Sequence, residues 1–191
     1  LLALLYTFHP VPAVMAAFIA TMATVTADTW ATELGVLSRD LPRLITTWKP
    51  VEKGTSGAVS VRGTLATSAG ALLIGFAAML FFSAYESAQS ALSGGQAPWW
   101  PIFLGMAWTL PVALAGGLAG SLFDSLLGAT AQAMYYSPYR QKETEKRIDP
   151  NGQPNVFLRG WAWLDNDAVN FVSSLVGAAV GALAWWLLGS L

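Results

Sequence analysis

Cysteine is absent from this 191-residue sequence, and histidine occurs once, at position 9. A chain without cysteine forms no disulfide and offers no thiolate as a metal ligand or nucleophile. His9 lies at the start of the first long apolar stretch, and the acids of that stretch lie toward its other end. We therefore expect neither a histidine-based metal site nor a catalytic triad, which leaves oxygen ligands for any metal ion.

Charged residues are also scarce. They make up 11% of the chain, against about 25% in a typical soluble domain, while 54% of the residues are hydrophobic. The net charge of -1 gives no reason to expect a nucleic-acid partner. This composition predicts an integral, multi-pass membrane protein whose helices contact membrane lipids.

Four apolar stretches are long enough to cross a bilayer, which takes about 20 helical residues at ~1.5 Å rise each. They predict membrane helices over residues 11–37, 61–82, 99–135 and 165–188. The third would measure about 55 Å unbroken, nearly twice a ~30 Å hydrocarbon core, so we expect it to kink or split at Pro111, Gly116, Gly117 or Gly120. The predicted fold is all-α, a polytopic transmembrane helical bundle of about four membrane helices that forms a single domain over residues 1–191.

The basic residues are confined to two segments. All ten Lys and Arg lie between Arg39 and Arg62 or between Arg140 and Arg159. The positive-inside rule therefore predicts that the loops over about 38–60 and 136–164 are cytoplasmic. Because Leu1 to Tyr6 read like the end of another hydrophobic segment, we also expect further helices upstream.

Small residues recur at helical spacing in two of the predicted helices. Such residues let helices approach closely, either within one chain or across a homodimer, and the spacing does not separate the two. The two sets are Ser173, Gly177 and Gly181 in the last helix, and Thr64, Ser68 and Gly75 in the second.

Acidic residues lie within or at the ends of the apolar stretches, where a charge at the bilayer centre costs about 2.5–3.5 kcal/mol. Asp28 and Asp124 lie about 26 Å and about 38 Å along their helices, so both approach the cytoplasmic boundary. The alternative is that such groups satisfy one another or cap helices, which is the preferred reading for Asp165 alone. As a set they predict a functional site. They are Asp28, Glu33, Asp124, Asp165 and Asp167.

A loop rich in Gly and hydroxyl residues runs from Lys53 to Thr64. Glycines let backbone N–H groups approach an anion, the following helix adds its positive N-terminal dipole with Ser60 as N-cap, and Lys53 and Arg62 add charge. The segment matches no Walker A motif. A flexible turn would use the same residues, so a phosphate site is favoured only because acids lie nearby. Carboxylates beside phosphates indicate Mg²⁺.

Five motifs occur in the order of a known family. They are ADTWATELG at 27–35, PRLIT at 42–46, KGTSG at 53–57, GSLFDSLLGA at 120–129 and LDNDAVNF at 164–171. In these motifs the chain resembles the membrane family long labelled as a domain of unknown function, which includes plant phytyl-phosphate kinase. The resemblance covers most of the chain from Ala23 onward.

The resemblance implies a membrane prenyl-phosphate kinase, which transfers a phosphoryl group from a nucleoside triphosphate to phytyl phosphate or a related prenyl phosphate. Distant similarity to the dolichol-kinase and cytidylyltransferase group favours CTP as donor. The catalytic candidates are Asp28, Glu33, Asp124 and Asp167, of which Asp28, Glu33 and Asp124 are also the candidate Mg²⁺ ligands. The candidates for binding substrate or nucleotide are Arg43, Lys53, Gly54, Thr55, Gly57, Ser60, Arg62, Ser121, Ser125, Gln132, Asn166 and Asn170.

Three alternatives stay open. A CTP-dependent lipid cytidylyltransferase would use the same groups on a different phosphate bond. A transporter would also place polar residues on broken helices, although transport sites tend toward the membrane midplane and these acids gather near one boundary. A non-catalytic assembly protein would leave the acids and the Gly-rich loop unexplained.

Overall fold

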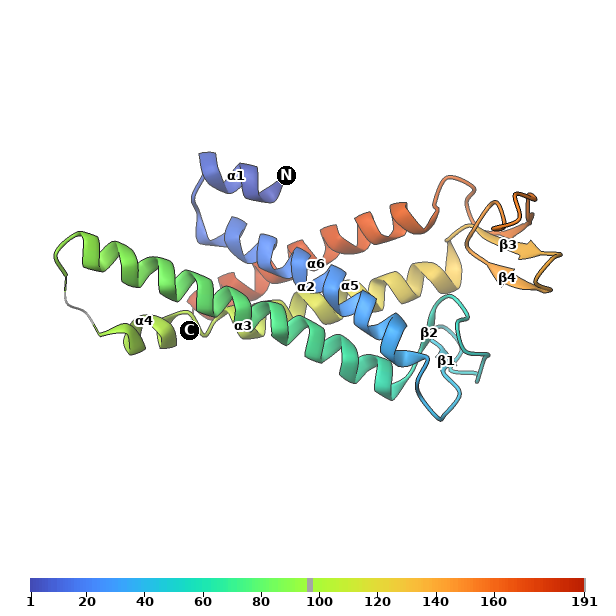
Figure 1. The fold of residues 1–191 in the computed structure, drawn as a ribbon, viewed down its shortest axis with the longest axis horizontal. Helices are drawn as coiled ribbons and strands as arrows, with labels where there is room; N and C mark the ends of the chain where they lie inside the picture. Colours follow the sequence, from blue (N-terminus) through green and yellow to red (C-terminus); the bar gives the residue numbers. More distant parts are fainter. Residues whose placement is uncertain (96–97, 191) are drawn as a thin grey trace.

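The computed structural model describes residues 1–95 and 98–190. Within these residues the chain is mostly helical, with five short strands in two of its connections (Figure 1). The helices are α1 (Leu2–Phe8), α2 (Pro12–Gly35), α3 (Val61–Leu92), α4 (Trp99–Gly105), α5 (Thr109–Thr130) and α6 (Asn166–Gly189).

Four helical stretches are long and apolar enough to cross a membrane, as predicted. They are Pro12–Gly35, Val61–Leu92, Trp99–Thr130 and Asn166–Gly189. In Figure 1 they lie along one long axis, and the chain reverses direction between one span and the next. The connections α2–α3 and α5–α6 therefore meet at one end of the bundle, which we call the loop end.

The third span is split, as expected, but the position of the break was not predicted. α4 ends at Gly105 and α5 begins at Thr109, so the break precedes Pro111. Proline has no N–H to donate and its ring clashes with the carbonyl four residues earlier, so a helix accepts it in the first turn but not in the interior. Gly116, Gly117 and Gly120 lie inside the continuous helix α5, where they serve helix packing and make no kink.

The second span is longer than predicted. α3 continues to Leu92, whereas the apolar pattern ends near Phe82. The additional turns carry Ala, Glu and Gln, which are strong helix formers and keep the backbone helical where the hydrophobic pattern has ended. A hydrophobic pattern marks the part of a helix that matches lipid and does not mark where the helix stops.

α2 is the central helix, and it packs against α3, α5 and α6. At the crossing, Thr24 Oγ1 donates a hydrogen bond to the Gly116 carbonyl of α5 at 3.0 Å. A Cβ added at Gly177 of α6 would lie 1.9 Å from Thr24 Oγ1, and one added at Gly120 of α5 would lie 2.3 Å from Thr24 Cγ2. The backbones of α2, α5 and α6 therefore approach one another closely around the Thr24 hydroxyl.

The predicted small-residue rows divide into two groups. Gly177 and Gly181 of α6 face α2, and Gly75 of α3 faces Thr109 and Ala113 of α5, so these positions pack helices within the chain. The Thr64 side chain donates to the Ser60 carbonyl and the Ser68 side chain donates to the Thr64 carbonyl, so both bonds lie within α3 and its N-cap, and Thr64 is exposed.

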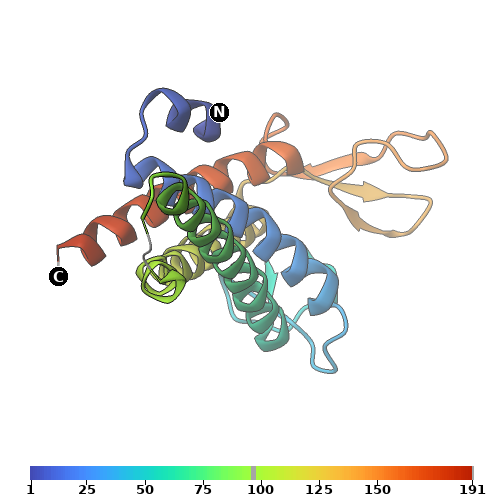
Figure 2. The same cartoon turned by 60° about the vertical axis from the view of Figure 1, so that its left-hand side comes forward.

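The two loop-end connections contain strands. The segment between α2 and α3 forms an antiparallel pair, β1 (Arg43–Leu44) with β2 (Ala58–Val59). The segment between α5 and α6, expected to be a solvated loop, folds into a sheet of order β4-β3-β5 made of Met134–Ser137 (β3), Lys142–Thr144 (β4) and Val156–Arg159 (β5). Tyr135 on β3 stacks edge-on against Phe157 on β5, which gives this small sheet an apolar contact. The sheet projects beyond the helices (Figure 2).

The Gly177→Ala substitution should lower the free energy of unfolding by about 1–3 kcal/mol, because its methyl group would overlap the Thr24 hydroxyl. Gly189→Ala is the matched control on the same helix, since nothing lies within 4 Å of a Cβ there. Thermal unfolding in detergent measures both variants. Equal midpoints would contradict the close packing at Thr24.

Candidate functional site

A cavity of about 210 Å³ lies at the loop end between α2, α3 and α5. The α2–α3 connection covers it, and Glu145 and Asn166 reach it from the other connection and from α6. Ten of the predicted site residues line it: Asp28, Lys53, Gly54, Thr55, Gly57, Ser60, Ser121, Asp124, Ser125 and Asn166. Six do not: Glu33, Arg43, Arg62, Gln132, Asp167 and Asn170.

Two carboxylates from different helices face this cavity without a basic partner. Ser121 Oγ lies 3.5 Å from Asp28 Oδ1, a long hydrogen bond. Asp124 Oδ2 is buried and, within residues 1–95 and 98–190, forms no hydrogen bond of standard geometry. Among the residues that the structure describes, neither acid forms an ion pair with Lys or Arg. Because a buried charge is costly unless it is paired, the arrangement favours an external cation.

The helix crossing explains why the two acids meet. Thr24 of α2 packs on Gly120 of α5, and both helices run toward the loop end. Asp28 and Asp124 each follow their contact residue by four positions, which is about one helical turn. The same contact that packs the helices therefore delivers both carboxylates to one level of the bundle.

The Gly-rich loop is fixed against the ends of two helices. Gly57 has a φ of +79°, and a Cβ there would lie 2.3 Å from the Ala129 nitrogen of α5. Ser56 Oγ donates a hydrogen bond to Gln132 Oε1 at 2.9 Å, so Gln132 holds the loop from outside the cavity. Ser60 caps α3, as predicted, by accepting from the Gly63 N–H at 3.0 Å. The cavity wall is therefore an ordered loop at a helix N-terminus.

The three predicted cations have different positions. Lys53 lines the cavity, and its Nζ donates to the Ser38 carbonyl. Arg62 donates to the Leu37 carbonyl at 3.0 Å, and Arg43 donates to the Trp48 carbonyl at 2.8 Å. Arg43 and Arg62 thus bond to the backbone of the α2–α3 connection, which leaves Lys53 as the predicted basic residue in the cavity wall.

The motifs predict that Asp167 and Asn170 of α6 and Glu33 of α2 belong to the site, but these three residues do not line the cavity. Asp165 caps α6 by accepting from the Ala168 N–H at 3.0 Å, as expected. Asn166 lines the cavity, whereas Asp167 and Asn170 are exposed outside it. Glu33 is likewise exposed at the end of α2, so the acids that share the cavity are Asp28, Asp124 and Glu145. Within the described ranges no three acidic or histidine side chains are close enough together to hold a metal ion by themselves.

Glu145 was not predicted from the sequence, because it lies in a charged run typical of a solvated loop. The small sheet carries it: Glu145 follows β4 directly and lines the cavity. No local residue spacing predicts that Glu145 lines the cavity, because its position depends on how the whole α5–α6 connection folds.

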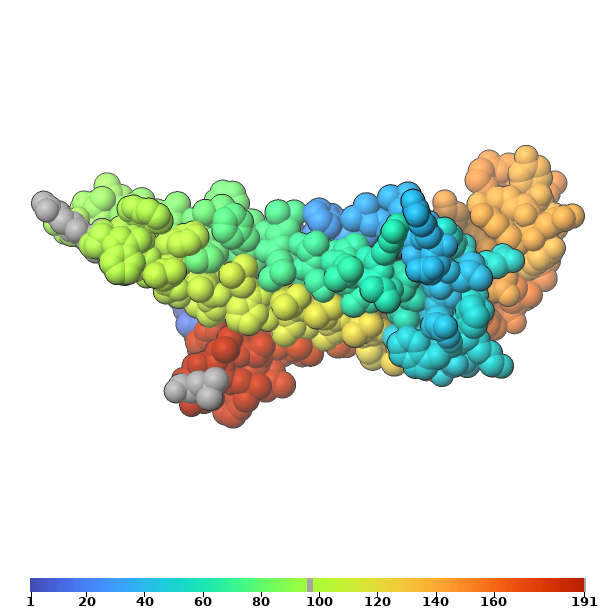
Figure 3. Space-filling view, turned by 90° about the horizontal axis from the view of Figure 1, so that it is seen from below, coloured from blue at the N-terminus to red at the C-terminus, as the bar shows by residue number. Residues whose placement is uncertain are grey.

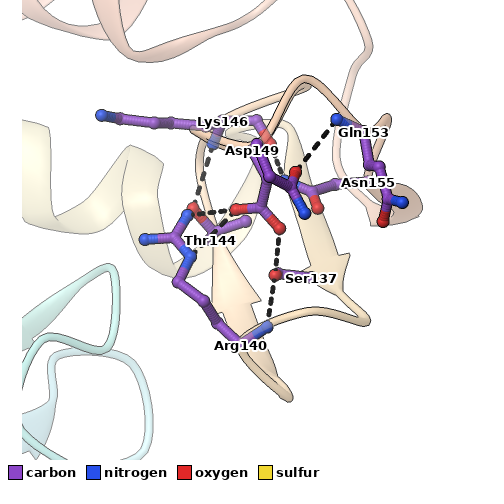
Figure 4. A network of polar contacts seen from close by, with 8 residues as sticks. Ser137, Arg140, Thr144, Lys146, Asp149, Gln153 and Asn155 are labelled. Carbon is purple, nitrogen blue, oxygen red and sulfur yellow. Dashed lines mark hydrogen bonds and ion pairs between the residues drawn. The ribbon is translucent and has the colours of Figure 1, made fainter.

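An ion pair between the half-buried Arg140 and the buried Asp149 stabilises that connection (Figure 4). Asp149 Oδ1 accepts from Arg140 Nε at 2.9 Å and from Arg140 Nη2 at 2.6 Å. Asp149 Oδ2 accepts from Ser137 Oγ, which in turn accepts from the Arg140 N–H at 2.9 Å. The Ser137 hydrogen bond first, and then the Arg140 guanidinium, hold the pKa of the Asp149 carboxyl below its usual range.

A bundle of membrane-length helices with a polar cavity at one end defines this chain as an integral membrane protein. More specifically, it belongs to the integral membrane protein family DUF92, whose family model matches residues 1–178. The family resemblance carried by the five motifs is therefore confirmed.

Several relatives support this assignment. Protein PGR of Arabidopsis thaliana is 38% identical over 159 residues, which is 82% of this chain and 50% of the plant protein. An uncharacterized membrane protein of Methanocaldococcus jannaschii is 34% identical over 88% of this chain and 50% of its own length. One of Synechocystis is 31% identical over 85% of this chain and 45% of its own length. The chain thus spans about half the length of these curated relatives.

No solved structure matches the chain.

The Gly57→Ala variant should release the loop from α5, because its Cβ would meet the Ala129 backbone. Gly54→Ala is the matched control: it also has a positive φ, of +84°, but nothing lies within 4 Å of a Cβ there. We expect the control to cost about 1 kcal/mol of backbone strain and to keep the loop in place. Hydrogen exchange of residues 53–60 should rise much more in Gly57→Ala. Equal exchange in both variants would contradict the docking of the loop on α5.

The sheet of the α5–α6 connection should become labile in acid. Because the pKa of Asp149 is lowered in the folded state, its contribution to stability is present above the usual Asp pKa and is lost as the pH falls below about 4. Limited proteolysis between Ser137 and Arg159 should therefore speed up in that range. The Asp149→Asn variant should be cleaved readily at neutral pH, while Glu143→Gln, at an exposed position on β4, should behave as the wild type. An acid-insensitive wild type would overturn this role of Asp149.

Proposed function

We propose that this chain is the kinase part of a membrane protein that transfers a phosphoryl group from a nucleoside triphosphate, with CTP favoured, to phytyl phosphate or a related prenyl phosphate. One observation carries the proposal. Asp28 and Asp124 line a cavity and, among the described residues, neither is paired with Lys or Arg; a Gly-rich loop that bears Lys53 forms another part of the cavity wall. Carboxylates that need a cation and a loop suited to phosphate are the two components of a phosphoryl-transfer site.

The loop is suited to phosphate for three reasons. Its glycines Gly54 and Gly57 line the cavity and would let backbone N–H groups approach an anion, the N-terminus of α3 adds a positive dipole behind Ser60, and Lys53 supplies a formal charge. Thr55 and Ser56 lie in the same wall, where their hydroxyls donate to the Glu52 carbonyl at 2.8 Å and to Gln132 Oε1 at 2.9 Å and so hold the loop in place.

The residues present fit Mg²⁺. Mg²⁺ takes oxygen ligands and commonly uses one or two carboxylates together with substrate phosphates and water, so it needs no cage of three acids. The unpartnered Asp124 Oδ2 and the carboxylate of Asp28 are such ligands, and Ser121 and Ser125 lie beside them. When bound, the ion would neutralise the negative charge that accumulates on the transferring phosphoryl group. Glu33 takes no part in this proposal because it is exposed outside the cavity.

The reaction forms one bond and breaks one. An oxygen of the prenyl phosphate attacks the γ-phosphorus of the nucleotide, and the bond from that phosphorus to the β–γ bridging oxygen breaks. The products are the prenyl diphosphate and a nucleoside diphosphate. Because the attacking phosphate oxygen is already anionic, no strong general base is needed, and the protein's part is to position the two phosphates and offset their repulsion.

The location of the cavity suits a lipid phosphate and a soluble nucleotide. It lies at the loop end, next to both basic connections, and the positive-inside rule places that end in the cytoplasm. The resemblance to a family that includes phytyl-phosphate kinase supports the choice of substrate. A transporter is disfavoured by the same location, since the acids lie toward one end of the spans.

Labelled CTP tests the proposal and separates it from a cytidylyltransferase. Full-length protein in liposomes is given phytyl phosphate, Mg²⁺ and CTP labelled at either the α- or the γ-phosphate. A kinase transfers only the γ label and makes prenyl diphosphate, whereas a cytidylyltransferase transfers the α label to the lipid. We expect γ transfer.

The Asp28→Asn and Asp124→Asn variants should each lose activity by roughly a hundredfold or more, because they remove a charge that the transition state needs while keeping the side-chain shape. Asp40→Asn, at an exposed position outside the cavity, is the control and should retain activity. Folding is checked by thermal unfolding. Transfer of neither label from CTP or ATP by folded wild type would reject the enzyme, and full activity in both acid variants would reject the site.

A further inference from the structure

Two of the seams between the helices around the cavity show close helix contacts. In the seam between α2 and α3, a Cβ added at Gly70 of α3 would lie 3.3 Å from the Trp30 ring of α2. One added at Gly63 of α3 would lie 3.6 Å from the Ala31 carbonyl oxygen of α2. Toward α5 and α6, one at Gly116 would lie 2.9 Å from the Gly177 carbonyl oxygen. At these positions the helices on both sides of each seam are in close contact.

The seam between α3 and α5 is different. The two helices are in contact deep in the bundle, where a Cβ at Gly75 would lie 3.0 Å from Ala113 Cβ and one at Gly117 would lie 2.6 Å from Ala71 Cβ. At the loop end they are joined through the Gly-rich loop, since Ser56 and Gly57 pack on α5 while Ser60 begins α3. Figure 3 shows the face on which α3 and α5 lie side by side, with the α2–α3 connection at one end.

Between these two closures, both helices line the cavity. α3 contributes Thr64 and Thr67, and α5 contributes Leu118 and Leu122. Thr64 is exposed and Leu122 is 44% exposed, so the cavity wall and the molecular surface share these residues. This surface lies on α3 and α5, which both belong to membrane-length spans, so it would face the hydrocarbon of the bilayer.

We propose that the seam between α3 and α5 is a lateral opening through which the isoprenoid chain of the substrate leaves the cavity for the bilayer, with Leu118 and Leu122 contacting the units next to the phosphate. This inference rests on the proposed function and adds the path and the contacts of the lipid chain. An apolar chain in this seam would touch leucine on one wall, and its phosphate would lie among Asp28, Asp124 and Lys53.

This path has a consequence for specificity. A cavity of about 210 Å³ cannot enclose a long isoprenoid chain together with two phosphates. Units beyond the first few would lie in lipid, where every chain length has the same surroundings. We therefore expect the enzyme to discriminate strongly against very short chains and weakly among long ones.

These 191 residues contain no cysteine, so a single introduced thiol is unique among them, and any cysteine elsewhere in the full-length protein is first replaced by serine. Leu122→Cys places a thiol in the seam, and Leu175→Cys, 51% exposed on α6, is the matched control outside the cavity. Full-length variants in liposomes are labelled with a membrane-permeant maleimide, with or without farnesyl phosphate. At about ten times its Kd, farnesyl phosphate should slow labelling at position 122 about tenfold and leave position 175 unchanged. Inorganic phosphate with CTP should protect neither.

A second measurement uses turnover. Leu122→Trp should raise KM for phytyl phosphate at least about tenfold by filling the seam, while Leu175→Trp should not change it. Wild-type kinase activity with no protection at position 122 and no KM change in Leu122→Trp would overturn the opening and leave the proposed function intact. Protection at position 122 without any phosphoryl transfer would support the opening and overturn the kinase. Neither protection nor transfer would overturn both.

Discussion

The contact of Thr24 with three glycines is the constraint on which the rest of this structure depends. Its hydroxyl bonds the Gly116 carbonyl, and its side chain fills the space that a Cβ at Gly120 or Gly177 would need. In a membrane, helices gain little from burying apolar surface against one another, so close backbone approach and interhelical hydrogen bonds supply the stability. This crossing fixes α2, α5 and α6 together, and one turn further along it also fixes the distance between Asp28 and Asp124.

The proposed chemistry follows from what that geometry leaves unsatisfied. Asp28 and Asp124 line one cavity, and in the part of the chain that the structure describes neither is paired with a basic side chain and Asp124 Oδ2 forms no hydrogen bond. The structure does contain an acid that is fully paired: Asp149, with Arg140 and Ser137, stabilises the sheet beside the cavity. The contrast separates a structural carboxylate, which has a basic partner, from the two carboxylates on which the proposed cation site depends.

Much of the fold could be predicted because lipid imposes a simple rule on the sequence. Four apolar stretches predicted four spans, and Ser60 and Asp165 marked helix starts, because N-caps are local signals. The break at Met106–Trp108 was not predicted, because hydropathy does not show that Pro111 belongs to the first turn of a new helix. The extra turns of α3 were not predicted either, because they follow from the helix propensity of polar residues beyond the apolar stretch.

The sequence predicted the part of the candidate site whose residues lie on the membrane helices or in the loop that follows α2. Asp28, Asp124 and the loop from Lys53 meet as their depth along the helices indicated. Glu33, one turn beyond Asp28, is exposed, and Arg62 bonds to backbone, because spacing alone does not say which side of a helix end faces the cavity. Glu145 was not predicted, because its position at the cavity depends on the folding of the small sheet, which no local sequence pattern indicates.

The central claim is that Asp28 and Asp124 bind one divalent cation together with phosphate. The most direct test is a structure of the full-length protein in lipid with CTP and Mn²⁺ in place of Mg²⁺, in which anomalous scattering locates the ion. The account predicts a Mn²⁺ peak bound by both carboxylates, with the nucleotide phosphates against the loop from Lys53 to Ser60. Nucleotide and ion bound elsewhere, with both carboxylates free, would contradict it.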